Sequence, residues 1–302
     1  YKSLALYGLA RTLQLQGNIE NALVNFSAVV DSFPKTGEAM KALYQIGDIR
    51  MNQLFDPLAA RDAYQIILKR YPRSSNRFDA IFKIGDTYSA QGDFKNARQW
   101  YQKPLQEQSL HTEIRSHALY RLALLDFGEE KWEDAVKKLE AITKTGSENL
   151  PGDEQTLVND ALDLMLLIQE CKTEKEPLAL YSRTLLLEYK RLWSEAIDTL
   201  NVILALFPQS KIADDAALRI GTLEYLRKNY NSSIDAYRRL IRDYSDSYLC
   251  ERSKKRIAEI YENELGDSKA AQLEYEQFMT QYPNSLYLEE IRKKVRTYEK
   301  HL

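Results

Sequence analysis

Polar and apolar residues in the segment 81–108 follow the period of an α-helix on both sides of a short polar turn. Side chains three and four residues apart share one face of a helix, so each half of the segment is predicted to be an amphipathic helix. The turn lies at Gln91-Gly92-Asp93, and the segment is therefore predicted to be a helical hairpin. Pro104 in the second half is expected to kink that helix, because proline has no backbone N–H to donate.

The same hairpin pattern recurs along the chain. One position, taken from Phe82 and called the reference position, is aromatic in the first five copies. Consecutive reference positions stand 37 or 38 apart in the numbering, except Tyr120 and Tyr181, which stand 61 apart. A period of this length with two helices per unit is typical of an α-solenoid. The reference positions are Tyr7, Tyr44, Phe82, Tyr120, Tyr181, Leu218 and Arg256.

Further series of positions predict how the two helices of each hairpin pack. Helices approach closely only where side chains are small. Three residues after the reference position stand mostly small residues, namely Ala10, Gly47, Gly85, Ala123, Thr184 and Gly221, with Glu259 as the exception. Small residues also recur fifteen residues after it, and four residues further on the residue is mostly large. The large series is Phe26, Ala63, Tyr101, Leu139, Leu200, Tyr237 and Tyr275.

A third recurring feature is the motif aromatic-Pro-x-Ser/Thr, which begins at Phe33, Tyr71, Phe207 and Tyr282. Proline stops the preceding helix, and the hydroxyl can cap the next one. Together with the small-residue positions, these endings resemble tetratricopeptide repeats, whose usual unit is about 34 residues long. The longer unit is similar to that of bacterial envelope members, of the outer-membrane barrel assembly lipoprotein and Tol-Pal coordinator type. The resemblance covers nearly the whole chain.

The resemblance implies an all-α fold: a right-handed α-solenoid of about seven tetratricopeptide-like hairpins, with one extra helix in the middle and a C-terminal capping helix. The pattern breaks at the polar stretch 144–152. We expect an N-terminal subdomain of four hairpins over residues 1–146. A C-terminal subdomain over residues 153–302 is expected to hold the extra helix, three hairpins and the cap. The extra helix, 153–171, is apolar on several faces, which predicts burial between the two halves. The capping helix is predicted over 285–301.

Composition narrows the function classes. Lys and Arg number 42 and Asp and Glu 44, and this balance gives no support for nucleic-acid binding, which usually needs a basic excess. No apolar run approaches the roughly 18 residues that a membrane-spanning helix needs, so no transmembrane helix is expected. Cys171 and Cys250 lie in different copies of the repeat, and no disulfide between them is expected. The chain begins at Tyr1 rather than Met, so we expect a processed or trimmed piece.

No catalytic constellation is visible in the sequence. His111 and His117 are six residues apart, which does not place two metal ligands on one helical face. Neither cysteine stands in a CxxC pair, and motifs for phosphate loops, dinucleotides and nucleophile elbows are absent. The chain is therefore predicted not to be an enzyme and to need no cofactor or metal.

The first helix of each tetratricopeptide hairpin lines a concave groove, so the resemblance places the reference position there. An aromatic series on that face could hold a peptide, because aromatic anchors give a large contact area. In the alternative interpretation these aromatic residues pack between neighbouring hairpins. The series ends at Leu218 and Arg256, which favours the first half. The candidate groove residues are Tyr7, Arg11, Tyr44, Asp48, Asp79, Phe82, Asp86, His117, Tyr120 and Tyr181.

Chaperone-binding tetratricopeptide repeats carry a Lys and an Asn four residues apart that clamp a C-terminal carboxylate. The first three copies here lack that clamp, which disfavours a cytosolic chaperone adaptor. At these positions stand Tyr7 and Arg11, Tyr44 and Asp48, and Phe82 and Asp86.

The expected function is a non-catalytic protein–protein interaction scaffold that binds a protein or peptide in its groove. The resemblance implies a periplasmic or outer-membrane-associated location in a bacterium, with a cytoplasmic location left open. Two alternatives remain. In the first, the chain is a structural subunit whose faces are buried in a larger or self-associated assembly. In the second, it is the repeat region of a larger enzyme or sensor.

Overall fold

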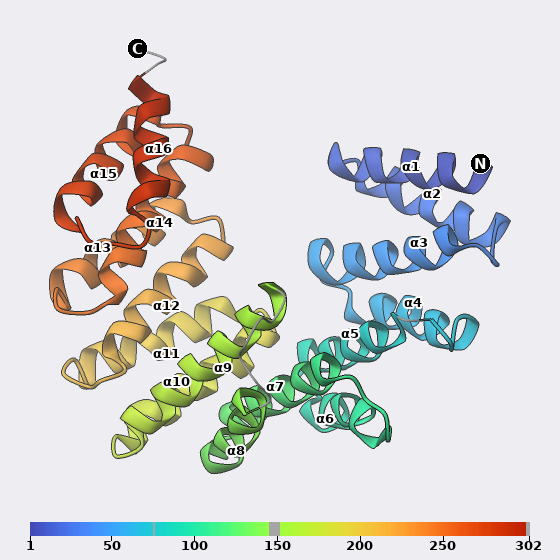
Figure 1. Ribbon diagram of the computed structural model, residues 1–302, viewed down its shortest axis with the longest axis horizontal. Coiled ribbons are helices and arrows are strands. Elements are labelled where there is room, and N and C mark those ends of the chain that lie inside the picture. Colours follow the sequence, from blue (N-terminus) through green and yellow to red (C-terminus); the bar gives the residue numbers. More distant parts are fainter. Residues whose placement is uncertain (75, 145–151, 300–302) are drawn as a thin grey trace. The chain divides into compact units, whose positions relative to one another are not determined.

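The computed structural model describes residues 1–74, 76–144 and 152–299, and the regular elements in these ranges are all helices (Figure 1). This confirms the predicted all-α fold. The chain divides into two compact units, each described by itself. Unit 1 comprises Tyr1–Met165 with Tyr189–Arg191, and unit 2 comprises Leu166–Glu188 with Leu192–Leu302. Residues 145–151 of the predicted polar break lie outside the described residues.

Unit 1 contains four hairpins whose two helices pack against each other. The pairs are α1 (Lys2–Leu15) with α2 (Ile19–Ser32), α3 (Gly37–Asp48) with α4 (Pro57–Arg70), α5 (Arg77–Ala90) with α6 (Phe94–Gln102), and α7 (Thr112–Gly128) with α8 (Trp132–Thr143). A π-helix, η1 (Ile49–Gln53), follows α3, and a 3₁₀-helix, η2 (Pro104–Gln106), follows α6. The extra helix is α9 (Gly152–Cys171), and the division between the units falls within it.

Unit 2 contains the remaining hairpins and the terminal helix. The pairs are α10 (Lys175–Tyr189) with α11 (Trp193–Leu206), α12 (Ala213–Leu226) with α13 (Tyr230–Asp243), and α14 (Leu249–Asn263) with α15 (Ser268–Gln281), followed by α16 (Leu288–Glu299). We call α1, α3, α5, α7, α10, α12 and α14 the first helices of their hairpins.

The predicted close approach of helices within a hairpin is confirmed by glycine–tyrosine contacts. A Cβ atom built on Gly85 would lie 2.3 Å from a ring carbon of Tyr101, and one built on Gly221 would lie 2.4 Å from the Tyr237 ring. Such distances are far inside van der Waals contact, so only glycine lets these rings lie flat against the first helix. Tyr101 and Tyr237 are consequently almost fully buried.

The large position of the second hairpin is Tyr64, and the assignment of Ala63 to it was wrong. A Cβ atom on Gly47 would lie 2.3 Å from the Tyr64 ring. The cause is the π-helix Ile49–Gln53, because each π turn accommodates one residue more than an α turn and shifts the register of the residues after it. Beyond it the cap forms as predicted: the Asp56 carboxylate accepts a hydrogen bond from the Ala59 N–H at 3.0 Å.

Pro104 ends a helix and does not kink one. The helix α6 stops at Gln102, and Pro104–Gln106 forms a single 3₁₀ turn. The prediction that the second helix continues through this proline was wrong. A proline at the first position of the new turn leaves no N–H unsatisfied, which favours a restart over a bend.

Helix α9 is buried along one stripe only. Leu157, Val158, Ala161 and Ile168 are each at most 8 % exposed, whereas Leu166 is 49 % exposed. The predicted burial of this helix between the two halves of the chain stays a prediction. A helix of this length needs only one apolar stripe to pack.

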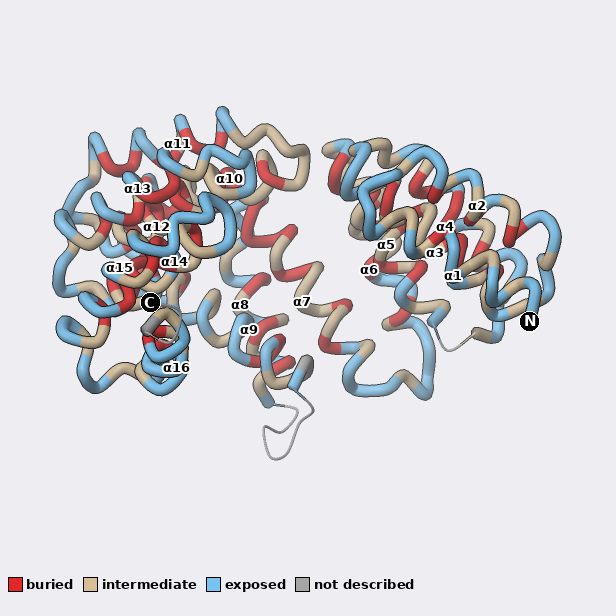
Figure 2. Tube along the Cα trace, turned by 90° about the horizontal axis from the view of Figure 1, so that it is seen from above, coloured by how far each residue is buried: buried red, intermediate tan, exposed pale blue. Residues whose placement is uncertain are grey.

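The two ends of the repeat array differ. The terminal helix α16 buries Ile291 and Val295 and exposes charged residues, as expected for a polar cap. Figure 2 shows buried residues along the sides where neighbouring helices of a unit meet, whereas α1 is largely exposed. On its outer side Ala5, Leu9 and Thr12 are exposed, and Leu9 is 51 % exposed. The equivalent residues of α5 are fully buried, namely Ala80, Ile84 and Thr87.

Neither cysteine forms a disulfide, and both are buried. Burial, followed by the charges of nearby carboxylates, raises the pKa of the Cys171 thiol to about 12. That thiol therefore stays protonated at neutral pH.

None of the described helices combines the length and the apolar character that crossing a membrane requires.

Candidate functional site

The space between the first helices of consecutive hairpins forms a recurring slot. In the slot between α3 and α5, the Asp48 carboxylate accepts a hydrogen bond from the Tyr64 hydroxyl at 2.7 Å and one from Lys83 Nζ at 2.6 Å. Tyr64 comes from the second helix of the same hairpin and Lys83 from the next hairpin. One carboxylate therefore joins three helices.

The slot between α5 and α7 has the same arrangement. The Asp86 carboxylate accepts a hydrogen bond from the Tyr101 hydroxyl at 2.7 Å and lies 3.4 Å from Arg121 Nε. The Arg121 guanidinium carbon is 4.6 Å from the centre of the Phe82 ring, which lies 6.4 Å from the His117 ring. Four of these five residues lie on first helices. Because they contact one another, the chain's own side chains fill the slot.

The phenols in both filled slots act as hydrogen-bond donors. Burial, followed by the negative charge of the neighbouring aspartate, raises the pKa of Tyr64 and of Tyr101 well above the usual value for tyrosine. Both hydroxyls thus keep their protons, and each donates its proton to the aspartate. Each aspartate therefore has two hydrogen-bond donors, and the polar groups of each slot form a stable network.

The predicted groove residues nearer the N-terminus also contact neighbouring side chains. The Tyr7 ring packs at 5.6 Å from the Phe26 ring. Arg11 donates hydrogen bonds to Gln14 at 2.8 Å and to Gln45 of the next hairpin at 2.5 Å. The first helices of the first two hairpins are therefore joined by polar contacts as well.

Tyr44 links its hairpin to the start of α5. Its hydroxyl donates a hydrogen bond to the Asn76 carbonyl oxygen at 2.5 Å. Burial, followed by the charge of Asp79, raises the pKa of Tyr44 above its usual range. Asp79 itself is exposed in the first turn of α5.

Exposure separates the predicted residues further. Phe82 is 4 % exposed, whereas Tyr120 and Tyr181 are half-buried. Tyr181 belongs to unit 2 and the other nine predicted groove residues belong to unit 1. The contacts described above are intramolecular, and a partner-binding role for the ten residues stays a prediction.

Unit 2 has an equivalent slot between α12 and α14, and there the aspartate is missing. Thr222 occupies the position of Asp48 and Asp86, four residues after the reference position. The Tyr237 hydroxyl lies 3.3 Å from the Thr222 hydroxyl oxygen. The contact between the first-helix glycine and the tyrosine, here called the glycine–tyrosine frame, is therefore kept, whereas the aspartate is replaced by threonine.

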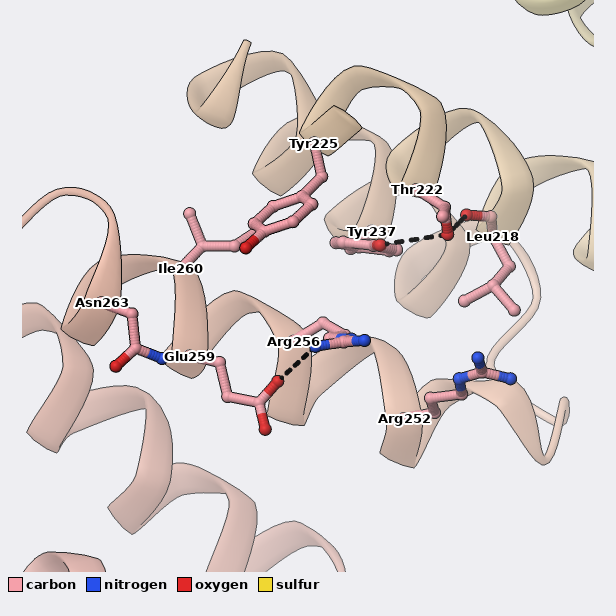
Figure 3. Close-up of a pocket in the computed structure, with 9 residues that line it drawn as sticks. All are labelled: Leu218, Thr222, Tyr225, Tyr237, Arg252, Arg256, Glu259, Ile260 and Asn263. Atoms are coloured by element: carbon pink, nitrogen blue, oxygen red, sulfur yellow. Dashed lines mark hydrogen bonds and ion pairs between the residues drawn. The ribbon is translucent and has the colours of Figure 1, made fainter. Parts of the chain in front are cut away.

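This slot is open. It forms a cleft with a volume of about 80 Å³, lined by Leu218 and Thr222 on one side and by Arg252 and Arg256 on the other (Figure 3). Figure 3 shows Arg252 facing Leu218, and Arg256 facing Thr222 and Tyr237. Both arginines are exposed. The cleft therefore presents two cations where the α3–α5 and α5–α7 slots present an ion pair.

The charges around the cleft are only partly balanced. Arg256 donates a hydrogen bond to the Glu259 carboxylate on its own helix at 2.9 Å. Glu259 also lies 3.5 Å from Lys255, which is closer to the Glu290 carboxylate, at 2.8 Å. The Arg252 side chain forms no ion pair or hydrogen bond with any residue of the described ranges. The cleft thus carries a positive charge that the chain's own acids do not fully offset.

One series of positions in the sequence indicates this cleft, but it is not the aromatic series from which the groove was predicted. The aromatic series ends at Leu218 and Arg256, and these two residues line the cleft. The informative series is the one four residues after the reference position, where an acid stands only in the second and third hairpins. The series reads Arg11, Asp48, Asp86, Leu124, Leu185, Thr222 and Ile260. That series becomes informative only once these side chains are known to face the next first helix.

No group of three or more histidine, cysteine, aspartate or glutamate side chains among the described residues is arranged to hold a metal ion. The polar groups on the first-helix face are suited to hydrogen bonding and ion pairing.

Two family models match the chain, both of tetratricopeptide repeats. One matches residues 4–36, 41–74, 215–247 and 256–285, and the other matches residues 78–106. No curated protein matches the chain.

Several solved structures are similar to the chain at low sequence identity. A tetratricopeptide repeat protein from Parabacteroides merdae ATCC 43184 is 17 % identical, over 87 % of this chain and 88 % of its own, with a TM-score of 0.32. PilF from Pseudomonas aeruginosa is 17 % identical, over 88 % and 98 %, with a TM-score of 0.31. The tetratricopeptide domain of P58(IPK) is 18 % identical, over 98 % and 77 %, with a TM-score of 0.32.

The matched repeats together cover more than half of the 302 residues, and they include both hairpins that border the open cleft. The resemblance to tetratricopeptide repeats is thereby confirmed, and the chain belongs to the tetratricopeptide repeat family.

Proposed function

We propose that the chain is a non-catalytic protein-interaction scaffold that binds a protein or peptide partner on the face formed by its first helices. The observation that carries this proposal is the open cleft between α12 and α14, which is accessible where the α3–α5 and α5–α7 slots are filled by an aspartate of the chain. Membership of the tetratricopeptide repeat family supports the same function.

The filled slots give this face a fixed shape. Ion pairs and hydrogen bonds such as Lys83 to Asp48 hold consecutive first helices at a set spacing. A surface that is ordered before binding loses little conformational entropy when a partner docks. A scaffold role needs this property, and no further chemistry is required of the side chains.

Site-specific photo-crosslinking in native extract tests the proposal. A photoreactive residue is placed at exposed first-helix positions, Lys41 and Asn263, and at exposed second-helix positions, Ser27 and Asp235. The expected result is that one protein is captured from the first-helix positions alone. Equal capture from both sets, or capture from the second helices only, contradicts the proposal.

The proposal extends to location: the chain acts in a bacterial cell envelope, in the periplasm or at the outer membrane. Its support is the resemblance of the long repeat to envelope members of the family. Fractionation of the host, with an epitope tag on the full gene product, tests it. Recovery in the periplasmic or outer-membrane fraction is expected, and recovery in the cytosol alone overturns this part.

A further inference from the structure

We propose that the cleft between α12 and α14 binds the side-chain carboxylates of an extended acidic segment of the partner protein. The inference rests on the proposed scaffold function and names the chemistry of its ligand. The carboxylate of the partner takes the place that Asp48 and Asp86 occupy in the filled slots.

The first step is the equivalence of the slots. Gly221 and Tyr237 form the same contact in unit 2 that Gly85 and Tyr101 form in unit 1. The Tyr101 hydroxyl donates to Asp86, whereas the Tyr237 hydroxyl has Thr222 as its one hydrogen-bond partner among the described residues. The tyrosine donor of the filled slots is therefore present here without the acid. The cation position of the filled slots, one residue after the reference position, is Ile257 here, and the cations of the cleft are instead Arg252 and Arg256.

The second step is charge. A guanidinium has five N–H donors and no acceptor, so it gains most from a carboxylate. In the α5–α7 slot Arg121 finds that carboxylate in Asp86. Arg252 finds none among the described residues, and Arg256 has only Glu259 of its own helix. An acidic ligand complements this surface.

The third step is spacing. Arg252 and Arg256 are one helical turn apart, so their Cβ atoms are about 5–6 Å apart. In an extended peptide, alternate side chains point the same way and are about 6–7 Å apart. Two carboxylates separated by one residue can therefore meet both arginines at once. A chain terminus supplies only one terminal carboxylate, and for this reason we assign the ligand as side-chain acids.

The apolar residues of the cleft indicate which residues should flank the acidic residues of the partner segment. Leu218 and Ile260 line the cleft beside the two arginines. The Tyr225 ring also lines it, and its hydroxyl is held by Glu264 at 2.6 Å. The segment that fits is thus acidic at alternate positions and carries aliphatic side chains between or beside them.

The test uses fluorescence anisotropy with a defined probe. The probe is a labelled peptide, Gly-Ser-Glu-Leu-Glu-Ser-Gly, with a blocked C-terminus, and its partner has both glutamates replaced by glutamine. The acidic peptide is expected to bind at least tenfold more tightly than the amide version, since charge-assisted hydrogen bonds distinguish the two. A third peptide carries the two glutamines and a free C-terminus. It separates side-chain from terminal recognition.

Three variants locate the binding. Arg252→Ala and Arg256→Ala are each expected to weaken binding of the acidic peptide about three- to tenfold. Thr222→Asp supplies the missing acid from within and is expected to abolish binding while the fold is kept. The matched control is Arg292→Ala on α16, an exposed arginine with a carboxylate three residues away, as Arg256 has. Its binding is expected to be unchanged.

Several outcomes overturn the inference. These are equal binding of the acidic and amide peptides, no binding of either at millimolar concentration, tighter binding of the free terminus, and unchanged binding by Thr222→Asp. An equal loss with Arg292→Ala would mean non-specific charge attraction. If the inference fails while crosslinking still captures a protein from Lys41 alone, the scaffold function stands and only the assignment of this cleft falls.

Discussion

The α5–α7 slot of unit 1 and the α12–α14 slot of unit 2 share one frame and differ in their polar groups. Arg121 of the first slot corresponds to Ile257 in the second. In both, a tyrosine lies against a glycine of the first helix. Asp86 completes the first slot, and Thr222 leaves the second one open. The comparison teaches that a repeat can keep its packing while a few positions decide whether polar groups serve cohesion or recognition.

The energetics explain why the exchange is tolerated. The Arg121 and Asp86 side chains are 27 % and 37 % exposed, and pairs in such settings contribute about 1 kcal/mol or less. The glycine–tyrosine contact is buried and close-packed, so it contributes far more to holding the hairpin. An open slot thus costs unit 2 little stability.

The largest effect is expected at the glycine frame that both slots share. Gly85→Ala and Gly221→Ala should each lower the free energy of unfolding of their unit by about 1–3 kcal/mol, because the new methyl group overlaps a buried ring. Denaturant melts with hydrogen exchange by mass spectrometry assign the loss to a unit. Gly8→Ala is the control, since nothing lies within 4 Å of its Cβ. If only one glycine is sensitive, the two slots do not share a frame.

The next largest effect is expected from removing the tyrosine hydroxyl, and it should differ between the two slots. Tyr101→Phe removes a buried donor from Asp86 and should cost about 1–1.5 kcal/mol. Tyr237→Phe removes a longer contact with Thr222 and should cost about 0.5 kcal/mol or less. The difference is measured from the midpoints of urea melts. Equal losses would contradict the view that the acid makes the first slot cohesive.

A smaller effect should come from closing the open slot. Thr222→Asp places a carboxylate beside Arg256 and Tyr237 and should stabilise unit 2 by about 0.3–1 kcal/mol at low salt. Because the new pair is partly exposed, most of the gain should vanish at about 1 M salt. Thermal melts at both salt concentrations test this. Destabilisation at low salt would show that the slot does not fit an acid.

The smallest effect concerns pH and the slot between α14 and α16. Burial acts to raise the pKa of Glu262, but hydrogen bonds from Lys294 and Tyr275 outweigh it and leave the pKa below its usual value. A carboxylate with a lowered pKa in the folded state stabilises that state above the unfolded value, about 4.3. The contribution is lost as pH falls further, through the folded value.

Hydrogen exchange in α16 should therefore quicken as pH is lowered below about 4, after correction for the intrinsic exchange rate. In the Glu262→Gln variant this pH dependence should be absent. An unchanged pH dependence in that variant would rule out Glu262 as the group responsible.

The features that the sequence predicted are those encoded within one hairpin. The Gly47, Gly85 and Gly221 series predicted the crossing of helices, and the Thr36 hydroxyl caps α3 by accepting from the Ala39 N–H at 3.3 Å. Helix periodicity and capping depend on neighbours a few residues away, so a single sequence displays them.

Features that depend on contacts between hairpins were harder to predict. The shift from Ala63 to Tyr64 arises from a π turn that no residue in the sequence announces. The pairing of Asp48 with Lys83 joins residues 35 apart, and their meeting depends on how one hairpin stacks on the next. The open cleft is a property of that stacking and of one threonine.

The exposed outer side of α1 makes the array extensible by engineering. Ala5, Leu9 and Thr12 repeat the pattern of Ala80, Ile84 and Thr87, which are buried in the stack on α4. A copy of residues 37–75 fused ahead of Tyr1 would pack on this existing surface of α1, and no new interface need be designed. The charged residues of α16 offer no such surface, so the array can be lengthened from one end only.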